Sequence, residues 1–171
     1  MAETHLTIRA IYEEIDRTKR NDPDATIYGV WNSILALQFP CSAGYVTRFH
    51  GENELLFHTY HYMDFKTIPT NFLVVQCKRQ SLQARPSGWE EGVNQLTQYL
   101  SDTHGKRPIW LRRPVYSFVA IGKLMRVFKY DDENECVLNW GLPGYPSGNI
   151  YHLVDDDVLF QQILDYIRAN H

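Results

Sequence analysis

The stretch that decides the fold is NFLVVQCKRQSLQARPSGWEEGVNQLTQYL, residues 71–100. Its apolar run Phe72–Val75 is rich in β-branched residues and predicts a strand buried on both faces in the middle of a sheet. With a period of two, Gln76 and Lys78 leave this strand on one face and Cys77 leaves it on the other. A lysine here needs an anionic partner or a ligand, because an unpaired buried ammonium destabilises the fold.

After a polar, turn-prone linker the period changes to about 3.6 residues, which predicts an amphipathic helix packed over the preceding strand. Ser87 is the expected cap, and Glu90 and Glu91 are expected in the first turn, where the helix dipole favours carboxylates. Gln95 and Tyr99 lie four residues apart on one edge of the helix. The apolar stripe comprises Trp89, Val93, Leu96 and Leu100.

A buried strand that ends in Gln-x-Lys, followed by a helix with Gln-x-x-x-Tyr, resembles the PD-(D/E)XK nuclease superfamily. The nearest variants are the Mrr-like enzymes and the N-terminal nuclease domain of type I restriction subunits, some of which use Gln-x-Lys. The resemblance covers roughly residues 28–130, with its sharpest match at Gln76, Lys78, Gln95 and Tyr99. It implies a restriction-endonuclease-like αβββαβ core and metal-dependent hydrolysis of DNA phosphodiester bonds.

The resemblance also assigns roles to individual residues. Asp64 and Gln76 would hold Mg²⁺ or Mn²⁺, and Lys78 would complete the catalytic set by orienting or activating the attacking water. Gln95 and Tyr99 would touch substrate or Lys78. A hairpin turn near Pro69 would set Asp64 opposite Leu73 or Val74, so a β-bulge is needed to bring it level with Gln76; otherwise His58 or Tyr60 takes its place.

A protein that binds nucleic acid also needs positively charged side chains to contact the phosphates. Lys106, Arg107, Arg112 and Arg113 form the one concentrated basic stretch of the sequence, so we expect Arg112 and Arg113 to contribute to DNA binding. A net charge of −3 and a pI near 6.1 argue against a surface that is basic throughout, so such binding would be local. The sequence leaves open a homodimer.

The 171 residues and the 44 % hydrophobic content fit a single globular domain, residues 1–171. Three cysteines without a paired spacing favour a reducing compartment. No apolar run is long enough to cross a bilayer, and the first ten residues lack the apolar core of a signal peptide. We therefore expect an intracellular protein, cytosolic or nuclear, that does not bind a membrane.

The remaining periodicities predict an α/β fold in which helices flank a central mixed sheet. The expected order is α, α, β, β, β, α, β, β, α, which adds N- and C-terminal helices to the αβββαβ core. The expected helices are residues 6–19, 28–39, 89–100 and 158–167, with the second sandwiched against the sheet. The expected strands are residues 44–49, 55–65, 72–78, 115–121 and 124–130.

Other readings stay open. The chain could be a catalytically inactive relative that binds a protein or a small ligand beside Gln95 and Tyr99, or a lyase or isomerase on an unrelated α+β scaffold. The histidines suggest a metal only by their number, and we expect surface or sheet-edge positions for His5, His50, His58 and His61. Residues 155–157, three consecutive aspartates, are expected to cap the last helix rather than to bind metal.

Overall fold

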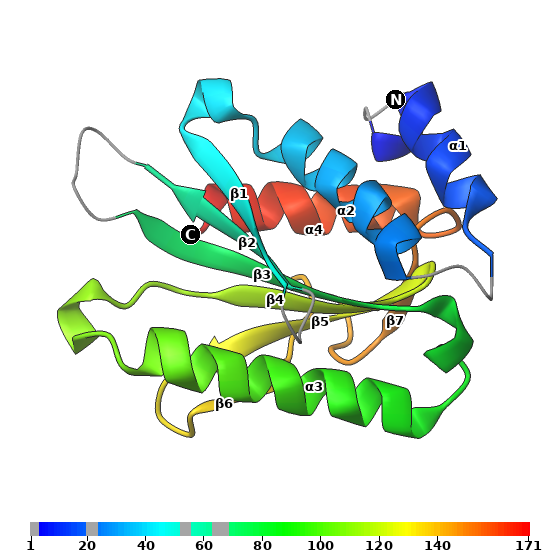
Figure 1. Cartoon of the computed structure of the whole chain (residues 1–171). Coiled ribbons are helices and arrows are strands. Elements are labelled where there is room, and N and C mark those ends of the chain that lie inside the picture. Colours follow the sequence, from blue (N-terminus) through cyan, green and yellow to red (C-terminus); the bar gives the residue numbers. More distant parts are fainter. Residues whose placement is uncertain (1–3, 20–23, 52–55, 63–68) are drawn as a thin grey trace.

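The computed structural model describes residues 4–19, 24–51, 56–62 and 69–171. Its described strands form a single seven-stranded sheet with helices on both faces (Figure 1). The helices are α1 (Arg9–Arg17), α2 (Asp24–Gln38), α3 (Pro86–Leu100) and α4 (Asp157–Ala169). The predicted class, α/β with a central sheet flanked by helices, is confirmed.

The sheet is mixed, as predicted. Its order is β1-β2-β3-β4-β5-β6, and β7 pairs with the same edge of β5 as β6, but at the start of that strand. All pairs are antiparallel except β3 with β4, because α3 carries the chain across one face of the sheet between these two strands. The strands are β1 (Tyr45–His50), β2 (Leu56–His61), β3 (Thr70–Lys78), β4 (Tyr116–Ile121), β5 (Leu124–Asp131), β6 (Cys136–Asn139) and β7 (Ile150–His152).

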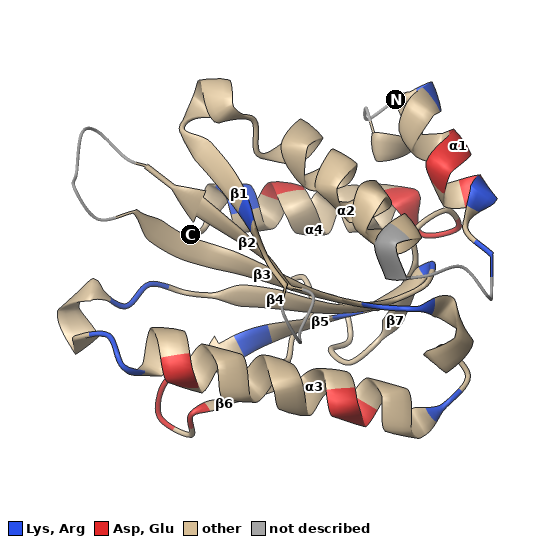
Figure 2. Cartoon of the chain, in the orientation of Figure 1, with Lys and Arg blue, Asp and Glu red and all other residues tan. Residues whose placement is uncertain are grey.

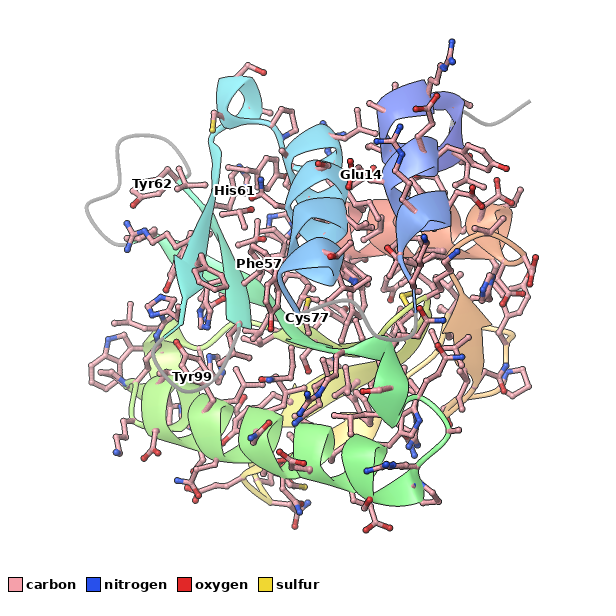
Figure 3. The ribbon with its side chains drawn as sticks, turned by 45° about the vertical axis from the view of Figure 1, so that its right-hand side comes forward. Glu14, Phe57, His61, Tyr62, Cys77 and Tyr99 are labelled. Carbon is pink, nitrogen blue, oxygen red and sulfur yellow. The ribbon has the colours of Figure 1, made fainter. Side chains whose placement is uncertain are left out.

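One face of the sheet is covered by α1, α2 and α4 (Figure 1). Helix α2 lies in the middle of this layer. Its Trp31 contacts both Phe118 of β4 and Phe160 of α4, with ring centroids 5.7 Å apart in each pair. The helix is apolar nearly all round because it is buried against the sheet and against a neighbouring helix. Figure 3 shows Phe57 of β2 and Cys77 of β3 on the α2 side. The expectation that this helix is sandwiched against the sheet is confirmed.

The opposite face is covered by α3, which buries the predicted stripe against a second apolar cluster. Trp89, Leu96 and Leu100 pack there on Val74 and Val119, while Val93 is partly buried at the margin. The alternation along β3 therefore sends Val74, Gln76 and Lys78 toward α3, and Val75 and Cys77 toward α2. The polar side chains at the end of β3 therefore lie on the α3 side of the sheet.

The start of α3 differs from the prediction. Helix α3 begins at Pro86, with Arg85 as the N-cap residue and without a side-chain cap, so the expected cap by Ser87 is wrong. Proline favours the first helical position because its fixed φ suits the helix and its missing N–H is not needed there. Glu90 and Glu91 consequently lie beyond the first turn, so their expected interaction with the helix terminus is also wrong.

The predicted order of elements is otherwise observed, with two additions. The sequence pattern does not predict strands β6 and β7, because they have only four and three residues and each buries only one side chain, Val137 and Tyr151. None of the three cysteines forms a disulfide. Among the described residues, no helix is long and apolar enough to span a membrane.

Candidate functional site

The Gln-x-Lys triplet ends β3 in the interior of the sheet. Gln76 pairs with Leu56 of β2 on one side and Val119 of β4 on the other, and the side chains of Gln76 and Lys78 are both on the α3 face. The exposed fraction of Gln76 is only 2 % and that of Lys78 only 7 %. The predicted pairing of a buried amide and a buried ammonium on one face is confirmed.

Lys78 has the anionic partner that its burial requires. Its Nζ donates to Oε1 of Glu91 on α3 at 2.9 Å, and the same oxygen accepts from Nε2 of Gln95 at 3.3 Å. The hydrogen bond from Lys78 is the main cause that lowers the pKa of the Glu91 carboxyl. The Glu91 side chain is 57 % exposed, so a buried ammonium is paired with a carboxylate open to solvent.

Gln76 is the least satisfied polar group of this set. Its Oε1 is buried and has no hydrogen-bond partner among the described residues. Leaving a buried carbonyl oxygen unsatisfied costs about 1–3 kcal/mol, so such an atom indicates a bound ligand or a partner outside the described residues. A cation or a donor hydrogen would satisfy it.

Asp64, the other predicted metal ligand, lies outside the described residues. The described register does overturn one expectation, because Leu73 and Val74 pair with Thr59 and His58 rather than with Asp64. A bulge is present in this hairpin, where Phe72 has no counterpart between the pairs Thr59–Leu73 and Tyr60–Asn71.

A second polar cluster lies beside this triplet on the same face, centred on His58 of β2. Nδ1 of His58 is 3.4 Å from each of three polar atoms: Oη of Tyr60, Nδ2 of Asn71 and Oη of Tyr99. Nε2 of His58 is buried and has no partner in the described part of the chain. The rings of His58 and Tyr99 meet edge to face, with centroids 4.5 Å apart. Figure 3 labels Tyr99 on α3, across the sheet from α2.

Burial dominates the electrostatics of this cluster. It lowers the pKa of His58 to about 3, and the positive charges of His50, Arg107 and Arg48 act in the same direction. Burial likewise raises the pKa of Tyr99 to about 12. At neutral pH His58 is therefore uncharged and lies beside the protonated phenol of Tyr99.

The expectation that the histidines lie on the surface or at a sheet edge is only partly correct. His50 is exposed on the edge strand β1 and His61 is partly buried, but His58 and His5 are buried, so the expectation is wrong for these two. The local sequence does not predict the burial of His58, because the helices that cover both faces of β2 come from distant parts of the chain.

Two of the predicted substrate-binding residues, Arg112 and Arg113, follow α3 at its far end. The guanidinium of Arg112 is engaged within the chain: Nη1 pairs with Asp132 at 3.0 Å, Nε donates to the carbonyl of Arg107 at 2.9 Å, and Nη2 donates to the carbonyl of Gly105. Arg113 is exposed, and it borders a groove of about 570 Å³ beside the β5–β6 turn.

The fit to a divalent metal is partial. Among the described residues, no group of three or more His, Cys, Asp or Glu side chains could hold a metal ion. The unpartnered Oε1 of Gln76 suits one oxygen ligand of Mg²⁺, but a hard cation also needs carboxylates. Of the aspartates at the start of α4, Asp156 is the N-cap residue, yet its carboxylate accepts from the backbone N–H of His152 and makes no cap hydrogen bond.

Gly92 controls how closely α3 approaches the triplet. A Cβ at Gly92 would lie 2.7 Å from Cγ1 of Val119 and 3.4 Å from Cε of Lys78. We expect Gly92→Ala to lower the free energy of unfolding by about 1–2 kcal/mol in urea titrations, because overpacking against a rigid, buried valine exceeds the gain of about 1 kcal/mol in helix propensity. Gly29→Ala on α2, where a Cβ would meet nothing within 4 Å, is the control and should be neutral or stabilising.

The chain was compared with known protein families, curated proteins and solved structures. No family model, no curated protein and no solved structure matches the chain.

Proposed function

We propose that this protein is a metal-dependent nuclease of the PD-(D/E)XK type that hydrolyses DNA phosphodiester bonds. The observation that carries the proposal is the connectivity α2-β1-β2-β3-α3-β4, in which β3 is antiparallel to β2 and parallel to β4. The same order of elements is expected of the αβββαβ core that the resemblance implies, and this agreement supports the proposal. The Gln-x-Lys triplet ends β3, and the Gln-x-x-x-Tyr helix packs directly over it.

The proposal gives a role to each described residue of the site. Gln76 would offer its unpartnered Oε1 to the cation, and Lys78 would hold the attacking water beside the scissile phosphate. Glu91 and Gln95 keep the ammonium of Lys78 oriented through the shared carboxylate oxygen. Bound Mg²⁺ would supply Lewis-acid stabilisation of the phosphoryl oxygens. Tyr99 and the neutral His58 form the polar wall next to the site.

The test is cleavage of single- and double-stranded DNA by the purified chain in Mg²⁺, in Mn²⁺ and in EDTA. Cleavage that requires the metal supports the proposal, and the absence of cleavage with every nucleic acid and metal would contradict it. The variants Asp64→Asn and Glu54→Gln test which carboxylate would bind the metal together with Gln76. Both residues lie outside the described part of the chain, but Glu54 precedes by two residues the strand partner of Gln76, Leu56.

Gln76→Glu is expected to raise the affinity for Mn²⁺ about tenfold or more, because a carboxylate is a stronger ligand than an amide for a hard cation. Titration calorimetry measures the change. Gln83→Glu is the matched control, since its Oε1 is also buried without a described partner but belongs to the linker before α3. Equal affinities of wild type and Gln76→Glu would count against a metal at this position.

A second candidate is an inactive relative that binds a protein or a small ligand beside Gln95 and Tyr99. The observation that favours it is the Lys78–Glu91 ion pair, because this pair satisfies the ammonium without any substrate. The two candidates differ in the metal requirement: a binding module should retain its ligand in EDTA and show no cleavage.

A further inference from the structure

The most exposed apolar side chains described in this protein are adjacent. Ile109 and Trp110 are each 79 % exposed, on the short 3-10 turn Ile109–Leu111 that follows α3, and Leu111 of the same turn is also exposed. Two of the other tryptophans, Trp31 and Trp89, are buried in the apolar clusters. Apolar side chains that stay exposed to water do not stabilise the fold. A contiguous patch of them, as here, therefore indicates a surface used for binding.

The turn is held in place from both ends. The backbone N–H groups of Leu111 and Arg112 donate to the carbonyls of Pro108 and Ile109 at 2.9 and 3.1 Å. The Arg112 guanidinium ties the segment to the carbonyls of Gly105 and Arg107 and to the carboxylate of Asp132. Trp110 is therefore presented on a preorganised backbone, which reduces the entropy lost when a ligand binds.

The charges beside the turn point to an anionic partner. Figure 2 shows basic segments on both sides of the turn, at the left end of the molecule. Lys106 and Arg112 are paired with Asp102 and Asp132, but neither Arg107 nor Arg113 forms an ion pair with any residue that the structure describes. One cation on each flank of an exposed indole is thus available to a ligand.

We propose that Trp110 is a stacking platform for an unpaired nucleobase, with Arg107 and Arg113 contacting the phosphates on either side. Every base has a π-face that an exposed indole can cover, and arginine binds phosphate through its guanidinium fork. This inference rests on the proposed function and narrows its substrate to nucleic acid with single-stranded character. In a duplex the base faces are already stacked on their neighbours, so a duplex offers the indole nothing without unstacking.

The acidic surroundings favour a strand over a lipid surface. Asp102 and Asp132, both exposed, lie next to the same turn, as their ion pairs with Lys106 and Arg112 show. An anionic bilayer is a broad plane that would bring headgroups against these carboxylates, whereas a single strand follows a narrow track between them. Arg107 also acts electrostatically on His58 and Tyr99, which connects the turn to the proposed site.

The experiment measures binding without cleavage. The full chain in EDTA is titrated against a fluorescein-labelled 20-mer of deoxythymidine, its 20-bp duplex counterpart, and vesicles of phosphatidylserine and phosphatidylcholine. We expect the single strand to bind more tightly than the duplex and to quench tryptophan emission. Trp110→Ala should weaken single-strand binding about 5- to 100-fold, and Trp110→Phe should restore part of it. Tyr145→Ala, a loop aromatic that is 49 % exposed, is the matched control and should bind like wild type.

The arginines have a separate readout. Arg107→Ala and Arg113→Ala should each reduce the slope of log affinity against log salt by about 0.7, as expected for one phosphate contact on a single strand. Single-strand binding unchanged by Trp110→Ala, a preference for the duplex, or binding to vesicles instead would overturn the inference. Cleavage in Mg²⁺ that is insensitive to Trp110→Ala would leave the nuclease proposal standing alone, whereas Trp110-dependent binding without any cleavage would leave only this inference.

Discussion

Lys78→Ala is expected to reduce metal-dependent cleavage by about 10²-fold or more in kcat while the protein stays folded. The rate falls because the ammonium is needed beside the attacking water and the developing charge. Stability should change by less than about 1 kcal/mol, because the partner left behind, Glu91, is largely exposed and can be solvated by water. Single-turnover cleavage rates and urea titrations measure the two quantities.

Three variants sharpen this test. Lys78→Met keeps the buried stem of the side chain and should lose activity like Lys78→Ala, which separates the charge from the packing. Glu91→Gln should destabilise the protein, because it removes the counter-charge from a buried ammonium. Arg9→Ala removes a cation from the Arg9–Glu13 ion pair on α1, on the other side of the sheet, and should retain activity. Cleavage that survives the loss of Lys78 would remove this residue from the catalytic set.

Acidification is expected to destabilise the protein through His58. The pKa of this histidine is about 3 in the folded chain and about 6.5 when unfolded, so the unfolded state binds more protons between these values. The stabilisation is complete above pH 6.5 and is lost as the pH falls toward 3. At pH 4 the loss from this single group is about 3 kcal/mol.

The measurement compares wild type with His58→Gln in urea titrations at pH 7.5 and pH 4. The variant should be less stable at pH 7.5 but should lose less stability on acidification, because its side chain does not take up a proton. Burial also lowers the pKa of His5, His104 and His171, so both proteins keep some acid sensitivity. An identical loss in the two proteins would mean that His58 does not titrate as an isolated buried group.

Local pattern was enough to predict the central strand and its helix. The change of period between residues 72–78 and 89–100 reports burial on two faces and then on one, and this depends only on neighbouring residues. The pairing of Lys78 with a carboxylate was also predictable in kind, because a buried ammonium demands it. Its identity was not, since the start of α3 at Pro86 decides that Glu91 rather than Glu90 faces β3.

The sequence by itself determined the α/β class, the order of the main elements and the exit of Gln76 and Lys78 on one face, because these follow from local periodicity. Only the tertiary structure decided the partner of Gln76, the burial of His58 and the exposure of Trp110. Strand register and the covering of a side chain depend on residues far apart in the chain. No local pattern records them, so a buried histidine and an exposed tryptophan became visible only once the sheet and its helices were assembled.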